Sequence, residues 1–128
     1  MTITEVSKKF DLSQDTLRYY ERIGLIPRVN RNKSGIRDYT EEDCNWVGFI
    51  KCMRNAGLPI EALIKYVDMF QQGDETIEAR KKLLIEQRKQ LVMRIEDMQK
   101  TLERLDYKIA RYEQGLAKKE KELREFKK

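Results

Sequence analysis

The first apolar residues of the chain repeat at intervals of three and four. Ile3, Val6 and Phe10 therefore share one face of a predicted helix that runs from the first to the last of them. Thr2 and Glu5 stand at its start with the spacing of a capping box, in which each side chain accepts a hydrogen bond from a backbone N–H. The pattern predicts a short amphipathic helix with one buried face.

A second short helix is predicted from Ser13, a favourable N-cap residue, to Gly24, which can end a helix in the left-handed conformation. One face carries Leu17, Tyr20 and Gly24, and the other carries Arg18, Tyr19 and Arg22. Only Asp11 and Leu12 separate the two helices, so they must pack at a steep angle. An apolar back and a basic, aromatic front are typical of the second helix of a helix-turn-helix, here over about residues 3–23.

Pro27 prevents this helix from continuing, and the next segment, about residues 27–39, contains Asn, Ser and Gly between its apolar residues. This composition is compatible with a small hairpin whose turn lies near residues 30–35. Its basic residues favour a wing that lies on phosphates. A flexible solvated loop is the alternative, and the segment alone does not decide between them.

Two further helices are predicted over about residues 41–56 and 59–70. Thr40 and Asp43 form a start signal for the first, and Pro59 is tolerated at the start of the second. Apolar residues follow at helical spacing: Trp46, Phe49, Ile50 and Met53, then Ile60, Leu63, Ile64, Val67 and Phe70. These stripes indicate a core, with a ligand-binding role for Trp46 or Phe49 as the alternative.

After a linker at residues 71–74, apolar residues repeat every seven positions through the segment 74–128. One core position holds Ile77, Leu84, Leu91, Met98, Leu105, Tyr112 and Phe126, and the other holds Arg88, Ile95, Leu102, Ile109, Leu116 and Leu123. This spacing predicts a coiled coil of about 70 Å at 1.5 Å per residue. Because the chain has no second long helix to cover the seam, we expect a homodimer.

The distribution of charged residues indicates where this mainly helical protein contacts a partner. The chain carries 27 Lys and Arg against 22 Asp and Glu. Residues 18–37 contain six basic side chains and only one acidic one, Glu21. A basic strip beside helix and turn signals is expected where a protein contacts nucleic-acid phosphates.

The two cysteines, Cys44 and Cys52, and the absence of histidine exclude several classes of site. On one helix the cysteines would lie about 12 Å apart, too far for a disulfide. They cannot form a closed thiolate metal site, and the chain has no Cys–His or Ser–His pair and no glycine-rich phosphate loop. We therefore expect no enzyme activity and no cofactor. Without a signal peptide or an apolar run of about 20 residues, a cytoplasmic protein without a membrane partner is expected.

Several motifs in this order resemble the MerR family of bacterial transcription regulators. They are Thr-Leu-Arg-Tyr-Tyr-Glu at 16–21, Gly-Leu at 24–25, Arg-Asp-Tyr at 37–39, Thr-Glu-Glu-Asp at 40–43 and Gly-Leu-Pro-Ile-Glu at 57–61. The resemblance implies a winged helix-turn-helix domain over residues 1–72, followed by a dimerisation helix that pairs as an antiparallel coiled coil.

The resemblance also implies a function. Such dimers bind a pseudo-palindromic stretch of double-stranded promoter DNA and distort its spacer so that RNA polymerase can read both promoter elements. The implied DNA-binding residues are Thr16, Arg18, Tyr19, Tyr20, Arg22, Arg37 and Tyr39. Which of them contact bases and which contact phosphates is left open. A coiled-coil interaction protein with an incidental basic strip is the alternative from another class.

The segment around Cys52, with residues 35–39 and a dimer helix without cysteine, resembles the AdhR/NmlR subgroup of this family. Members respond to aldehydes, other carbonyl electrophiles or nitrosative stress through one cysteine at this place, which implies Cys52 as the sensor. Lys51 and Arg54 flank it, and nearby positive charge favours the reactive thiolate. Cys44 lies beside acidic residues and is the weaker candidate. Two alternatives stay open: that Cys52 is a buried apolar residue, and that a small ligand binds noncovalently where the coiled coil meets the DNA-binding domain.

Overall fold

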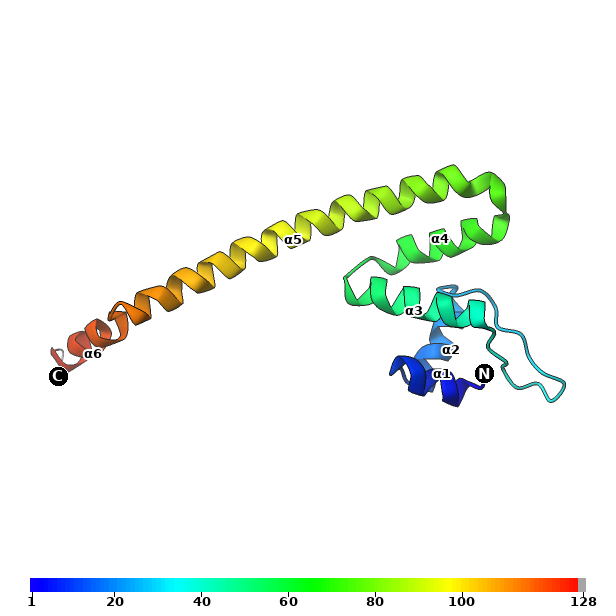
Figure 1. Cartoon of the computed structure of the whole chain (residues 1–128), viewed down its shortest axis with the longest axis horizontal. Coiled ribbons are helices and arrows are strands. Elements are labelled where there is room, and N and C mark those ends of the chain that lie inside the picture. The colour runs from blue at the N-terminus through cyan, green and yellow to red at the C-terminus, as the bar shows by residue number, and fades with distance from the viewer. Residues whose placement is uncertain (127–128) are drawn as a thin grey trace. The chain divides into compact units, whose positions relative to one another are not determined.

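The computed structural model describes residues 1–126, with the backbone alone at 116, 117, 125 and 126. The elements in chain order are α1 (Ile3–Phe10), α2 (Gln14–Ile23), α3 (Glu41–Asn55), α4 (Ile60–Gln72), the 3₁₀ helix η1 (Asp74–Thr76), α5 (Ile77–Glu113) and α6 (Leu116–Phe126). The chain forms two compact units, Met1–Leu91 and Val92–Lys128, and the boundary between them lies within α5. Figure 1 shows α1, α2, α3 and α4 within the first unit. The predicted fold class, mainly helical with a long C-terminal helix, is confirmed.

The predicted helix-turn-helix is present, and the predicted capping residues lie at the ends of its two helices. Thr2 and Glu5 make both hydrogen bonds of the capping box at the start of α1. Asp11 then takes the left-handed conformation, with φ of 52°, and turns the chain between the helices. At α2, the Ser13 hydroxyl accepts from the Thr16 N–H, and Gly24 ends the helix with φ of 85°.

The core of the first unit is formed by side chains from the four helices α1, α2, α3 and α4 and from the segment that follows α2. The side chains that are almost completely buried are Val6, Leu17, Leu25, Val29, Val47, Ile50, Leu63 and Val67. Ile3 and Phe10 are partly buried and pack against this core, as their spacing predicts. Helices α1 and α3 approach closely at Gly48, where an added Cβ would lie 3.1 Å from Cε1 of Phe10. Burial of these apolar side chains holds α2 in place from behind.

The predicted wing is an ordered loop with a single antiparallel bridge between Arg31 and Arg37. Apart from this bridge, residues 1–126 contain no β-strand. Its tip is fixed by Asn32, whose side-chain oxygen accepts from the N–H groups of Ser34 and Ile36 at 2.9 and 3.1 Å. Gly35, with φ of 77°, completes the turn. The expected hairpin therefore shrinks to one bridge, because the Asn32 side chain replaces ladder hydrogen bonds at the tip.

The predicted linker at residues 71–74 is shorter than expected, because α4 continues to Gln72. The buried Thr76 connects the two sides of the turn. Its hydroxyl lies 2.6 Å from the Met69 carbonyl oxygen and accepts from Nε of Arg80 at 3.0 Å. The Arg80 guanidinium also lies over the Phe70 ring, 5.4 Å from its centre. These contacts attach the start of α5 to the end of α4.

The C-terminal segment differs from the single helix expected over residues 74–128. Helix α5 ends at Glu113, and Gly115 has φ of 98°, a conformation that breaks a helix before α6 begins. The predicted core positions on α5 are largely exposed in the single chain, as at Ile95, Met98, Leu102, Leu105 and Ile109. The predicted core positions Leu116 and Phe126 lie outside the described side chains.

Candidate nucleic-acid interface

The outward face of α2 carries two arginines, each held by a neighbour. Nη1 of Arg18 donates to Asp15 at 2.9 Å, one helical turn earlier. The Arg22 guanidinium lies over the exposed Tyr19 ring, 5.5 Å from its centre. The partly exposed Thr16 hydroxyl is 2.7 Å from that of Ser13. The face therefore presents two oriented guanidinium groups and an accessible aromatic ring, all of which were predicted site residues.

Arginines from α2 and from the wing meet around one hollow of about 480 Å³. Its lining consists of Arg18, Glu21, Arg22, Arg28 and Arg37. The structure thus brings together three of the predicted site residues, Arg18, Arg22 and Arg37, and adds Arg28. Guanidinium groups that converge in this way can bind phosphate oxygens with charge-assisted hydrogen bonds.

Glu21 joins α2 to the wing, a role that sequence reasoning missed. Its Oε1 accepts from Nε of Arg37 at 2.7 Å, and its Oε2 accepts from the backbone N–H of Val29 at 3.2 Å. The Glu21 side chain is 12% exposed and that of Arg37 is 22% exposed. The available signal was a lone acid in a strip of six basic residues, but nothing in the spacing identified Arg37 as its partner.

Tyr20 and Tyr39, both predicted DNA contacts, are buried. Tyr20 is 6% exposed and Tyr39 is 2% exposed, and both belong to the core. Burial raises the pKa of each phenol, with an opposing effect from Arg54 at Tyr20 and from Arg37 at Tyr39. Their burial gives no support to direct DNA contact by these two rings, which stays a prediction. Tyr20 lies on the apolar face of α2, and Tyr39 fixes the end of the wing.

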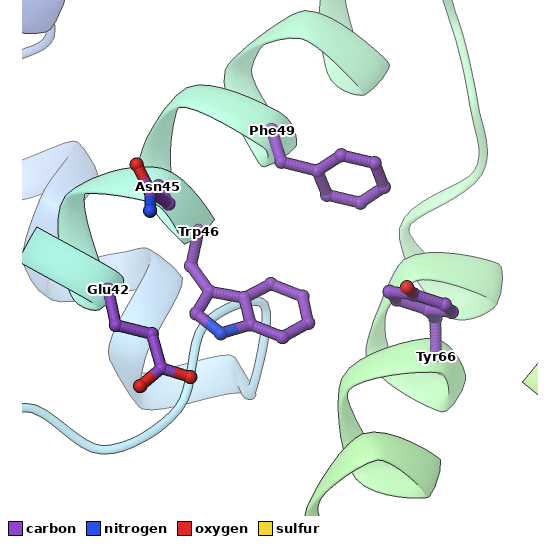
Figure 2. Close-up of a pocket in the computed structure, with 5 residues that line it drawn as sticks. All are labelled: Glu42, Asn45, Trp46, Phe49 and Tyr66. Carbon is purple, nitrogen blue, oxygen red and sulfur yellow. The ribbon is translucent and has the colours of Figure 1, made fainter. Parts of the chain in front are cut away.

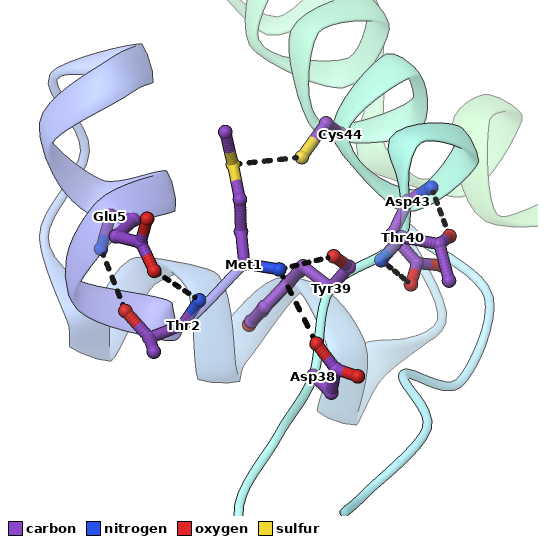
Figure 3. A network of polar contacts seen from close by, with 8 residues as sticks. All are labelled: Met1, Thr2, Glu5, Asp38, Tyr39, Thr40, Asp43 and Cys44. Atoms are coloured by element: carbon purple, nitrogen blue, oxygen red, sulfur yellow. Dashed lines mark hydrogen bonds and ion pairs between the residues drawn. The ribbon is translucent and has the colours of Figure 1, made fainter.

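Figure 3 shows how the end of the wing is attached to the start of the chain and to α3. The Met1 amino group donates to the Tyr39 carbonyl oxygen at 2.8 Å, and the Tyr39 N–H donates to that of Met1, also at 2.8 Å. Thr40 and Asp43, the predicted start signal, form a capping box at the beginning of α3 in the next residues. The wing therefore returns to the core at a fixed point.

The two cysteines have opposite environments, although both lie on α3. Cys52 is exposed, whereas Cys44 is buried with its Sγ 3.8 Å from Sδ of Met1. The exposure of Cys52 does not fit the alternative of a buried apolar residue. The flanking Lys51 donates to the carbonyl oxygen of Phe10 at the end of α1, so its cation also connects two helices.

The predicted core stripes of α3 and α4 meet in a cluster of aromatic rings. The Trp46 ring centre lies 5.0 Å from that of Phe70 and 5.9 Å from that of Tyr66. A shallow hollow of about 200 Å³ borders the cluster, lined by Glu42, Asn45, Trp46, Phe49 and Tyr66 (Figure 2). Because the rings pack against one another, their contacts support the predicted core role. Binding of a ligand by Trp46 or Phe49 stays a hypothesis.

In the described part of the chain, no group of three His, Cys, Asp or Glu side chains could hold a metal ion. None of the helices within residues 1–126 is long and apolar enough to cross a membrane.

Comparisons with known proteins agree with this geometry. The family description "MerR HTH family regulatory protein" matches residues 1–69, and "MerR, DNA binding" matches residues 45–107. The chain is similar to the HTH-type transcriptional regulator AdhR of Bacillus subtilis, with 61% identity over 92 residues. That match covers 72% of this chain and 66% of the relative's length.

Two solved structures are similar over most of their length. One is a MerR family protein from Listeria monocytogenes, with 50% identity, a TM-score of 0.89 and coverage of 99% of this chain and 96% of that chain. The other is HiNmlR, a MerR family regulator lacking the sensor domain, bound to promoter DNA. It has 32% identity, a TM-score of 0.82 and coverage of 91% and 92%. As its relatives are named as transcriptional regulators, the chain is a regulator and not an enzyme. The chain belongs to the MerR helix-turn-helix family of regulatory proteins.

Proposed function

We propose that this chain binds double-stranded promoter DNA through α2 and the wing and thereby controls transcription. The observation that carries the proposal is the hollow in which Arg18, Arg22, Arg28 and Arg37 converge between these two elements. A solved relative with the same fold is described as bound to promoter DNA. Phosphate contacts position such a protein on the duplex, and the exposed face of α2 is available to reach base edges.

The regulator acts as a homodimer that pairs through α5. The apolar residues Ile95, Met98, Leu102 and Leu105 lie on α5 at heptad spacing and are exposed in the single chain. A second copy supplies the same seam, and two DNA-binding surfaces related by two-fold symmetry require a pseudo-palindromic site. We further propose that the dimer distorts the spacer of a promoter so that RNA polymerase recognises both promoter elements, at a deformation cost of about a few kcal/mol.

Substitution of one arginine in the hollow tests the DNA interface. Because a dimer presents the residue twice, Arg18→Ala should remove about two phosphate contacts and lower the salt slope of DNA binding by about two. Fluorescence titration of a promoter duplex between about 50 and 200 mM salt measures both affinity and slope. Lys82→Ala removes the same charge from the exposed face of α5 and should leave the slope unchanged. Equal slopes for wild type and Arg18→Ala would contradict the proposed interface.

We also propose that an aldehyde or another electrophile regulates the protein by modifying Cys52. Support comes from the exposure of Cys52 on α3 and from the similarity to the regulator named AdhR. Cys52 directly follows Lys51, whose ammonium group donates to the end of α1. A group added to the Cys52 sulfur can therefore disturb the contact between α3 and the helix-turn-helix, which shifts the dimer towards its DNA-distorting form.

Two cysteine variants separate this sensor from its alternatives. Promoter activation by formaldehyde or methylglyoxal should be lost in Cys52→Ala and retained in Cys44→Ala. Mass spectrometry of the exposed wild-type protein should place the added mass on the peptide that contains Cys52. A response that persists in Cys52→Ala eliminates the covalent sensor while leaving DNA binding untouched, and would favour noncovalent ligand binding.

A further inference from the structure

Glu21 is a carboxylate in a surface that otherwise attracts phosphate. Arg18, Arg22, Arg28 and Arg37 line the hollow around it. A negative charge at this place repels the DNA backbone and offsets part of the attraction that the arginines provide. Glu21 is therefore expected to make a contact whose contribution to DNA binding is larger than this repulsion.

The hydrogen bonds of Glu21 connect the recognition helix to the wing. One carboxylate oxygen binds the wing where it leaves the core, through the N–H of Val29, and the other binds it where it returns, through Nε of Arg37. Both partners belong to the loop after α2, whereas Glu21 belongs to α2 itself. One side chain thus fastens both arms of the wing to the recognition helix.

Loss of the carboxylate would affect each arm in a different way. Val29 as a whole residue is 1% exposed, so its N–H would be left in a buried place without its acceptor, which is costly. Arg37 would lose the ion pair that orients its guanidinium group. The two arms would stay joined to each other, because the Asp38 N–H donates to the Asn30 carbonyl oxygen at 2.8 Å. They would no longer be held against α2, and DNA binding would have to bear the cost of ordering them there.

We propose that Glu21 is a positioning residue that pre-organises the wing for DNA, so that this acid strengthens binding to a polyanion. The proposal rests on the proposed DNA-binding function. Glu21 acts through Arg37 and Val29 and does not itself contact the nucleic acid. Its effect is opposite in sign to the one that simple charge counting gives.

The test compares two acids that each pair with an arginine of the same surface. Asp15 pairs with Arg18 within α2, and its side chain is 95% exposed, so Asp15→Asn removes the ion pair of that guanidinium group without releasing a loop. We expect Asp15→Asn to bind a promoter duplex more tightly than wild type. Glu21→Gln should bind about tenfold more weakly, the factor expected from one charge-assisted hydrogen bond. Tighter binding by Glu21→Gln, as for Asp15→Asn, would overturn the proposal.

A second arm does not depend on DNA. Amide hydrogen exchange of the free protein should be about tenfold faster at Val29 and Asp38 in Glu21→Gln than in wild type, with α1 and α4 unchanged. If wild type fails to bind DNA, the proposed function fails, and this exchange measurement still decides whether Glu21 orders the wing. Should Glu21→Gln lower the melting temperature of the whole domain, Arg37→Lys provides the second variant. It keeps the charge but removes Nε, and amide exchange at Asp38 in the free protein should also become faster; unchanged exchange in Arg37→Lys would refute the role of this pair.

Discussion

Tyr39 carries a hydroxyl group that is buried without a hydrogen-bond partner among the described residues. Such a group loses its water without compensation, which destabilises a fold by about 1–3 kcal/mol. The ring itself is useful, because it is enclosed by the core while its backbone pairs with Met1. Tyr39 therefore stabilises the fold through its ring and its backbone, whereas its hydroxyl group destabilises it.

This assignment predicts the effect of removing the hydroxyl alone. Tyr39→Phe should leave the free energy of unfolding unchanged or raise it by up to about 3 kcal/mol, because no hydrogen bond is lost. DNA affinity should stay within about twofold of wild type, since a buried hydroxyl reads no base edge. Urea unfolding and a DNA titration measure the two quantities. Weaker DNA binding at unchanged stability would show that the hydroxyl does reach DNA.

For single residues, the helical period of apolar positions predicted burial correctly on α2. It placed Leu17 and Tyr20 on the buried face of α2, and both are buried. The family resemblance also suggested that Tyr20 contacts DNA, a prediction that its burial does not support. Tyr39 lies outside any helix, so no period applied to it, and its backbone pairs with Met1 at the far end of the domain's sequence. The role of Glu21 was equally unreadable, because its partner Arg37 is 16 residues away.

Element boundaries were predicted well wherever a cap lies within three residues of the helix it starts. The boxes at Thr2 and Thr40 and the cap at Ser13 are all present. Features that no cap marks were predicted less well. The wing forms one bridge because the side chain of Asn32 satisfies the tip. Gly115 ends α5 although the heptad pattern continues past it, because the pattern records apolar spacing and not backbone conformation.

The turn between α4 and α5 gives a prediction at the scale of elements. Thr76→Val keeps the shape of the side chain but removes the hydroxyl that connects Met69 and Arg80. We expect the free energy of unfolding to fall by about 1–3 kcal/mol, because polar groups at this buried position lose their partner. Urea unfolding measures the loss.

Thr101 provides the matched control for this substitution. Its hydroxyl makes only an exposed hydrogen bond to the Asp97 carbonyl oxygen within α5. Thr101→Val should therefore change stability by less than about 0.5 kcal/mol. Equal losses in the two variants would mean that Thr76 does not connect α4 to α5 in the way its contacts suggest.

For the whole molecule, the exposed seam of α5 is the feature that the single chain leaves unexplained. Met98, at a predicted core position, is 71% exposed, and Leu102 and Leu105 are each 56% exposed. Apolar residues at heptad spacing are covered by a second helix in a coiled coil. The heptads predicted this exposure in the monomer, whereas the orientation of the second copy and the promoter sequence are properties of a complex that one chain does not encode in its spacing.

The central claim is that two copies of the chain bind one duplex through paired α2 and wing surfaces. Sedimentation of the protein with a promoter duplex that contains an inverted repeat tests it most directly. We predict a complex of two chains per duplex, formed from a protein that is already dimeric at micromolar concentration. With eight arginine contacts, its affinity should fall on the order of 10⁴-fold between 50 and 200 mM salt. A protein that stays monomeric, or that does not bind the duplex at low salt, would contradict the claim.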